Sequence, residues 1–117
     1  MRIVCPFPIN LRPAMDGLES AWVVVGTVQG DFFCISDIVE SGRDRLGRSV
    51  HIDGLREAIG TVHTHTADMP LPSEHDLRMD QVLANIYGVY LTGILSDQLR
   101  WFFLRAEDTH YTQVEHG

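Results

Sequence analysis

Two histidines, a serine and an aspartate fall within one short window of the chain, at residues 63–76. His63 and His65 are separated by one residue; seven residues later comes Ser73, and Asp76 follows three positions after it. Imidazole nitrogens and a carboxylate oxygen are ligands that zinc takes in proteins, and three such ligands leave a fourth position open for water. The window therefore predicts a catalytic zinc site.

The spacing of the two histidines suits the end of a β-strand. Residues i and i+2 of a strand point to the same face, and the apolar, β-branched run at residues 58–62 precedes His63. A proline-bearing loop, residues 69–72, then allows Asp76 to return over the strand. Cys5 and Cys34 are the two cysteines of the chain and lie far apart in sequence, so a cysteine-rich structural zinc site is excluded. They do not define a disulfide framework, and a bridge between them is left open.

Each half of the pattern also has a structural interpretation. Ser73 and Asp76 have the spacing of a helix N-cap and its N3 partner. A lone pair of histidines in a strand is often two solvated or hydrogen-bonded side chains. A capping serine at the mouth of a site still exposes its hydroxyl, so capping and chemistry can coexist. Amidohydrolase-type barrels also carry paired histidines with this spacing, but they are disfavoured because they need about 250 residues and this chain has 117.

The spacing H-x-H-x7-S-x-x-D resembles the signature of the JAMM (MPN+) zinc metalloproteases, in the Mov34/MPN/PAD-1 family. Residues 19–26, Glu-Ser-Ala-Trp-Val-Val-Val-Gly, are similar to the glutamate-bearing early strand of that family. Residues 59–66 resemble the segment that carries its two histidines, although Thr66 replaces the common proline. The resemblance covers roughly residues 18–104 and is that of a small prokaryotic-type member.

The resemblance implies a role for each of five residues. His63, His65 and Asp76 would hold a zinc ion, Glu19 would act as the general acid/base, and Ser73 would donate a hydrogen bond to the oxyanion.

Other polar residues compete for these roles or lie near them. Glu40 and Glu57 are the rivals for the glutamate, and position relative to the strands favours Glu19 over both. His75 neighbours Asp76, but on a helix it would point about 100° away from it, so we place it outside the ligand set. Asp68, in the loop, is expected to be solvated.

Composition limits the class of protein. The chain has 117 residues, 44% of them hydrophobic, which predicts one soluble domain over residues 1–117. The formal net charge is −7, and all nine basic residues are arginine. Nucleic-acid binding is therefore disfavoured. No apolar stretch is long enough to span a bilayer, and the first residues lack a signal-peptide pattern, so a cytoplasmic protein without a membrane partner is expected.

The periodicity of the chain predicts an α+β fold with a mixed, curved β-sheet flanked by helices, and the resemblance implies the cytidine-deaminase-like arrangement of JAMM/MPN domains. One helix is expected at residues 73–87, with Gly88 as its C-cap and an apolar face formed by Leu77, Val82, Leu83 and Ile86. The predicted strands are residues 22–28, 32–39, 46–52, 61–65, 90–95 and 99–104. Residues 2–8 are expected to be extended, 10–18 a short helix or turn, 55–59 at most one helical turn, and the last ten residues frayed.

The leading functional interpretation is a zinc-dependent isopeptidase. As the resemblance implies, it would cleave a ubiquitin-like or sulfur-carrier protein from a lysine side chain or from a linear fusion. A second interpretation is a peptidase that trims the C-terminus of a sulfur-carrier precursor. A third is a non-catalytic MPN scaffold; such scaffolds normally lack one or more ligands, whereas this chain has the full set.

Overall fold

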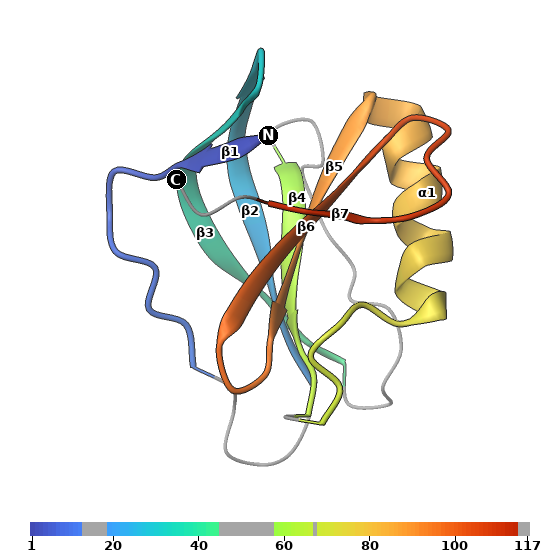
Figure 1. Cartoon of the computed structure of the whole chain (residues 1–117). Coiled ribbons are helices and arrows are strands. Elements are labelled where there is room, and N and C mark those ends of the chain that lie inside the picture. Colours follow the sequence, from blue (N-terminus) through green and yellow to red (C-terminus); the bar gives the residue numbers. More distant parts are fainter. Residues whose placement is uncertain (13–18, 45–57, 67, 115–117) are drawn as a thin grey trace.

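The computed structural model describes residues 1–12, 19–44, 58–66 and 68–114, with the backbone alone at residues 19 and 41–44. These residues form a seven-stranded sheet and one α-helix (Figure 1). The elements in chain order are β1 Arg2–Val4, β2 Glu19–Gln29, β3 Phe32–Asp44, β4 Ala58–Thr64, α1 Glu74–Tyr87, β5 Val89–Leu95, β6 Leu99–Arg105 and β7 Thr112–Gln113.

The sheet is mixed, and its strand order is β1-β3-β2-β4-β5-β6-β7. The β2–β3 and β5–β6 pairs are antiparallel hairpins, whereas β4 and β5 run parallel and are joined by α1. Parallel neighbours cannot be joined by a tight turn, so a crossover is required between them. The prediction of an α+β fold with a mixed sheet is confirmed; among the described residues, α1 is the one helix that flanks it.

The sheet curls until strands distant in its order meet. Three strands separate β3 from β6, yet the rings of Phe33 and Phe103 have centroids 6.0 Å apart. Both side chains belong to the main core on the concave face, together with Trp22, Val24 and Val62. This core therefore lies inside the curl.

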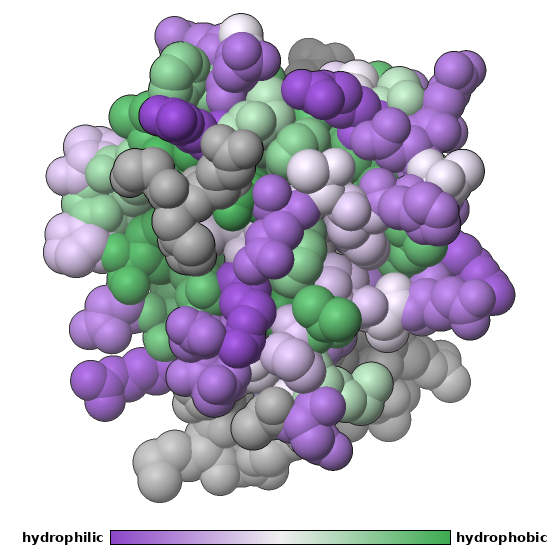
Figure 2. Space-filling view, viewed as in Figure 1, coloured by the Kyte–Doolittle hydropathy of each residue, from purple (hydrophilic) through white to green (hydrophobic). Residues whose placement is uncertain are grey.

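The N-terminal segment covers part of the concave core. Exposed and partly buried residues alternate along residues 1–12, which is the period of an extended chain with one face buried. The partly buried side chains that pack on the core are those of Met1, Ile3, Cys5, Phe7, Ile9 and Leu11. Figure 2 shows hydrophobic residues gathered on the side of the molecule where this segment runs, and mainly hydrophilic residues on the side of α1.

The convex face carries α1, which packs on β5 and β6. Ala84 of the helix is buried against Tyr90 and Leu104. The predicted apolar face of the helix is wrong in part, because the side chains of Val82 and Ile86 are 57% and 65% exposed. The buried stripe instead includes carboxylates, as described below, and this is why hydrophobic periodicity misplaced it.

Element boundaries differ from the predictions mainly in length. Strand β4 begins at Ala58, so residues 58 and 59 are strand rather than a helical turn. The C-terminal region is more ordered than expected, since β7 pairs with β6 and Val114 is buried. Residues 10–12 are not helical; the predicted strand at 46–52 and the remainder of the 10–18 segment lie outside the described residues.

The structure also bears on two questions raised by the sequence, the pairing of the cysteines and the presence of a membrane-spanning helix. Cys5 and Cys34 are free thiols and do not form a bridge. Within the described ranges, no helix combines the length and apolar character needed to cross a membrane.

Gly60 permits the close approach of β4 and β5. A Cβ at this position would lie 2.0 Å from the carbonyl oxygen of Leu91, so a Gly60→Ala chain must shift its backbone. We expect the free energy of unfolding to fall by about 1–3 kcal/mol, the usual cost of overpacking, as measured by urea denaturation. Gly30→Asn is the control: nothing lies within 4 Å of that Cβ position, and asparagine tolerates its positive φ. Equal loss in both variants would contradict this explanation.

Candidate metal centre

The ends of two neighbouring elements bring the site together. His63 lies on β4, between its register partners Ala21 of β2 and Ile94 of β5. His65 follows the strand, and its backbone amide donates to the Leu95 carbonyl at 2.9 Å, which extends the pairing by one step. Asp76 stands in the first turn of α1, which the crossover places over this end of the sheet.

Ser73 caps the helix, as its spacing predicted. The Asp76 amide donates to Ser73 Oγ at 3.1 Å, and the Ser73 amide donates to Asp76 Oδ2 at 2.8 Å, which completes a capping box. The second bond fixes the carboxylate of Asp76 as well as the helix start. A hydroxyl has one donor and two acceptor sites. Because Ser73 Oγ acts as an acceptor in the capping box, its O–H can still donate a hydrogen bond.

The three predicted ligands converge on one point. Asp76 Oδ2 lies 3.2 Å from His63 Nε2 and 3.2 Å from His65 Nε2. All three donor atoms lie within 4.8 Å of one another, and all three side chains are partly buried. A tetrahedral zinc with ligands at about 2.0–2.1 Å separates neighbouring donor atoms by roughly 3.3 Å. The donor spacing therefore fits such an ion.

The protonation of His65 is set by the loop that follows it. Its Nδ1 lies 3.1 Å from the carbonyl oxygens of both Met69 and Leu71. A carbonyl can only accept a hydrogen bond, so Nδ1 carries the proton, and in the neutral ring Nε2 presents a lone pair toward Asp76. Metal-binding histidines are commonly oriented by such a bond from their other nitrogen.

His63 supplies the test of whether an ion fits. Its Nε2 is buried and has no hydrogen-bond partner among the described residues, although the Asp76 oxygen is 3.2 Å away. A buried polar atom without a partner is uncommon and calls for an explanation. Two imidazole nitrogens and a carboxylate oxygen are all electron-rich, so their convergence is favourable when a cation or a proton lies between them. A metal ion satisfies all three at once.

Contacts within the ligand group shift the pKa values of Asp76 and His65. Burial opposes ionisation of Asp76, but the adjacent His63 and His65 rings and the Ser73 amide outweigh it and lower the pKa of Asp76. Contact with Asp76 raises the pKa of His65, against the opposing effect of burial. The carboxylate thus stays ionised and His65 retains a proton to higher pH than an isolated histidine.

The glutamate candidates are placed differently by the fold. Glu19 is the first residue of β2 and lies two positions before Ala21, the register partner of His63; its side chain lies outside the described residues. Glu40 is exposed and pairs with Trp22, whose side chain faces the concave core, away from His63. Glu57 lies outside the described residues.

Two ionisable residues close to the ligands in sequence, Asp68 and His75, lie outside the ligand group. His75 and Asp68 are both exposed, and neither belongs to the set of converging ligand atoms. This placement agrees with the expectation that His75 points away from Asp76 along the helix.

Asp80 is a feature of the site region that the sequence patterns did not reveal. It lies one helical turn beyond Asp76 and is 6% exposed. Its Oδ2 accepts hydrogen bonds from Thr92 Oγ1 at 2.6 Å and from the hydroxyl of Tyr111. Burial raises the pKa of Asp80, and these two bonds oppose the rise. The i, i+4 spacing of Asp76 and Asp80 was the available signal, since it places both carboxylates on one helix face.

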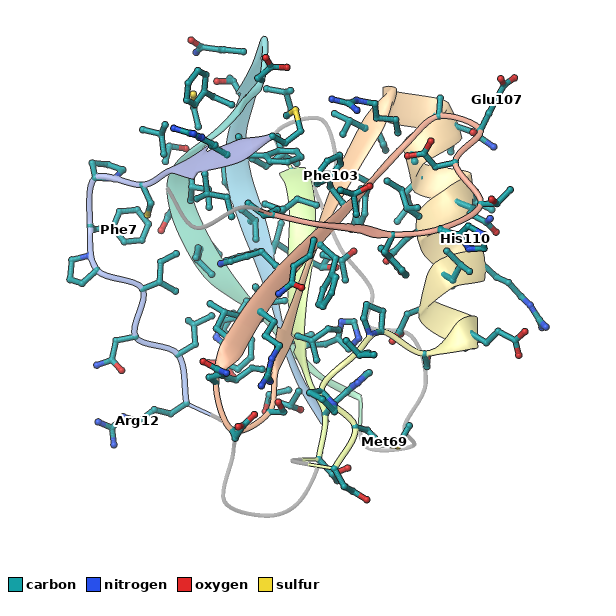
Figure 3. The ribbon with its side chains drawn as sticks, viewed as in Figure 1. Phe7, Arg12, Met69, Phe103, Glu107 and His110 are labelled. Atoms are coloured by element: carbon teal, nitrogen blue, oxygen red, sulfur yellow. The ribbon has the colours of Figure 1, made fainter. Side chains whose placement is uncertain are left out.

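These bonds tie α1 to the sheet on one side and to the C-terminal segment on the other. The same segment holds the helix further along: Gln81 donates to the Asp108 carbonyl at 3.2 Å, and Asn85 accepts from the Glu107 amide at 2.8 Å. Figure 3 shows Glu107 and His110 on the chain that runs beside α1. The helix bearing Asp76 is thus held by polar contacts as well as by the apolar packing of Ala84.

A comparison with protein families matches residues 14–107 to the prokaryotic homologs of the JAB domain. The match covers most of the chain, and the protein therefore belongs to this family, as a small prokaryotic member of the JAB/MPN group. No curated protein matches the chain. Membership is compatible with a hydrolase or with a scaffold, and the His63, His65 and Asp76 group is one that could hold a metal ion.

The raised pKa of His65 predicts how metal affinity depends on pH. A metal must displace the proton on this ring, so apparent Zn²⁺ affinity should fall by about tenfold per pH unit below that pKa, the slope for one displaced proton. In the metal-free protein, the contact with Asp76 stabilises the fold fully below about pH 6.5 and is lost as pH rises through the raised pKa. Competition with a chromophoric chelator between pH 5.5 and 8 measures the first effect.

The matched control for this titration is His110→Gln. His110 is exposed and lies outside the ligand group, so its replacement should leave the pH profile unchanged. A flat profile in the native protein would contradict the assignment of His65 as a ligand.

Tyr111→Phe should destabilise the fold through Asp80. The substitution leaves the buried Asp80 side chain with Thr92 as its remaining hydroxyl donor, and removing a partner of a buried polar group costs about 1–3 kcal/mol. Chemical denaturation of the two proteins measures the difference. Tyr87→Phe, at an exposed position on α1, serves as the control; a comparable loss there would show that the hydroxyl of Tyr111 is not the cause.

Proposed function

We propose that this protein is a zinc-dependent hydrolase that cleaves an isopeptide or peptide bond at the C-terminus of a ubiquitin-like or sulfur-carrier protein. The observation that supports it is the meeting of His63 Nε2, His65 Nε2 and Asp76 Oδ2, with His63 Nε2 buried and lacking a hydrogen bond. Three protein ligands with an open position are typical of catalytic rather than structural zinc sites.

Each residue assigned to the candidate site has a part in this hydrolysis. When bound, zinc supplies a positive charge beside the substrate carbonyl and a water molecule with a pKa near neutrality. Glu19 takes the proton from the attacking water and returns it to the leaving amine as the C–N bond breaks. The Ser73 hydroxyl donates a hydrogen bond to the carbonyl oxygen as negative charge develops there. The Ser73 amide keeps the Asp76 carboxylate in place.

The backbone supports Glu19 as the acid/base residue. The Ser20 amide donates to Thr64 Oγ1 at 3.0 Å, which fixes the start of β2 beside the end of β4. Glu40 is on β3, which β2 separates from β4.

The proposed substrate class rests on the family resemblance. The alternative function is that of a scaffold protein without catalytic activity. The complete ligand group favours the hydrolase.

Glu19→Gln tests the proposal. The variant should bind Zn²⁺ as tightly as the native protein, because Glu19 is not a ligand, and should lose turnover by about 10²-fold or more, the scale of acid–base catalysis. The assay is cleavage of isopeptide-linked and linear ubiquitin-like fusions by zinc-loaded protein, with zinc content measured by atomic absorption. Asp76→Ala should lose both zinc and activity.

Glu40→Gln is the matched control and should retain full activity. An undiminished rate in Glu19→Gln would transfer the acid/base role to another carboxylate. Native protein that folds normally but purifies without zinc and cleaves none of these fusions would favour the scaffold.

A further inference from the structure

An arginine shares the sheet face of the metal centre. Register places four residues in one row across the strands: Ala21 on β2, His63 on β4, Ile94 on β5 and Arg100 on β6. Two strand spacings separate His63 from Arg100, which corresponds to about 10 Å between their backbones. Register partners point to the same side of a sheet, so Arg100 belongs to the face of His63.

Neighbouring residues on β6 confirm this orientation. Phe102, two residues after Arg100, packs its ring against Tyr111 on the convex face, with ring centroids 6.0 Å apart. Trp101, between them, faces the other way: a Cβ on Gly93 would meet both Trp101 and Val62 on the concave side. Arg100 therefore extends from the same convex face that carries α1 and the metal ligands.

The guanidinium is held at the end of the sheet where the metal ligands lie. Its Nη1 donates to Ser96 Oγ at 3.1 Å and to Asp97 Oδ1 at 2.9 Å. Ser96 directly follows Leu95, whose carbonyl accepts the amide of His65. The β5–β6 turn and the segment after β4 occupy the same end of the sheet (Figure 1). The turn that holds the guanidinium thus begins at the residue after the one that is hydrogen-bonded to His65.

The arginine retains capacity for a ligand. Its side chain is 23% exposed and that of Asp97 is 57% exposed, and exposed ion pairs contribute little to stability. Guanidinium has five N–H donors, and within the described part of the chain its Nε and Nη2 make no hydrogen bond. The planar fork of these donors matches a carboxylate.

We propose that Arg100 is a carboxylate-binding subsite of the metal centre, and that it selects substrates with a carboxylate one to three residues from the bond that is cleaved. Two extended residues span about 7 Å and three about 10 Å, which is comparable with the two strand spacings, about 10 Å, between the backbones of Arg100 and His63. The inference rests on the proposed hydrolase function. Two sources can supply this carboxylate: the free C-terminus of a short leaving peptide, or an acidic side chain near the scissile bond.

The test compares four synthetic peptides that share one ubiquitin-like C-terminal sequence followed by two residues. The first pair differs at the C-terminus, which is a free acid in one peptide and an amide in the other. The second pair consists of two C-terminal amides, one with a glutamate and one with a glutamine after the scissile bond. Binding is measured by calorimetry on zinc-loaded Glu19→Gln protein, and turnover on the native enzyme. Tighter binding of the acid-bearing peptide by about 10- to 100-fold, the value of a charge-assisted hydrogen bond, is expected, and the preferred peptide identifies the source.

Variants of the strand separate Arg100 from general charge effects. Arg100→Gln should bind acid and amide peptides equally, and Arg100→Lys should recover part of the preference. Arg105→Gln is the matched control, because Arg105 is exposed on the same strand and stacks over Phe103, on the other face; its preference should be native. Asp97→Asn removes the competing carboxylate and should strengthen binding of the acid peptide, which provides a second test if Arg100→Gln does not fold.

The outcomes also distinguish this inference from the proposed function. Equal binding of acid and amide peptides by the folded native protein, or a preference that survives in Arg100→Gln, would overturn the subsite even if the peptides are cleaved. Arg100-dependent binding of acid peptides without any cleavage would support the subsite and count against the hydrolase.

Discussion

The parallel pairing of β4 with β5 is the constraint on which the site depends. Parallel neighbours must be joined by a crossover, and here the crossover is the 65–73 loop and α1. Because the helix must return along the strands, its first turn falls over the end of β4. This topology brings the histidines at the end of that strand close to the aspartate in that turn. The cap at Ser73 then selects the orientation of the carboxylate.

The helix is unusual in what it buries. The stripe that faces the sheet contains Asp76 and Asp80, while Val82 and Ile86 face solvent. A buried carboxylate is costly unless its bonds are made, and Asp80 is supplied by two hydroxyls from different elements. The position of Asp76 is therefore specified by directional bonds, which define a register along the helix more sharply than apolar contacts do.

Local patterns predicted the parts of the molecule that local chemistry determines. Short-range spacing predicted the strand before His63, the cap at Ser73, the end of the helix at Gly88 and the strands at residues 22–28, 32–39, 90–95 and 99–104. The structure contains each of them. The apolar face of α1 was misassigned because hydrophobic periodicity counts carboxylates as solvent-exposed. The pairing of β7 and the place of Arg100 on the sheet face of His63 depend on register between strands distant in sequence, which no single segment encodes. The assignment of Glu19 remains a prediction.

The loop that follows His65 holds this candidate ligand through its backbone. Two carbonyls, those of Met69 and Leu71, accept from His65 Nδ1, while the side chains of both residues are exposed. The orientation of His65 therefore does not depend on which side chains stand at positions 69 and 71. Any side chain that keeps the loop conformation leaves the two carbonyls in place. Substitutions at these two positions can thus alter the surface above the His63, His65 and Asp76 group one residue at a time, without changing the bonds that orient His65.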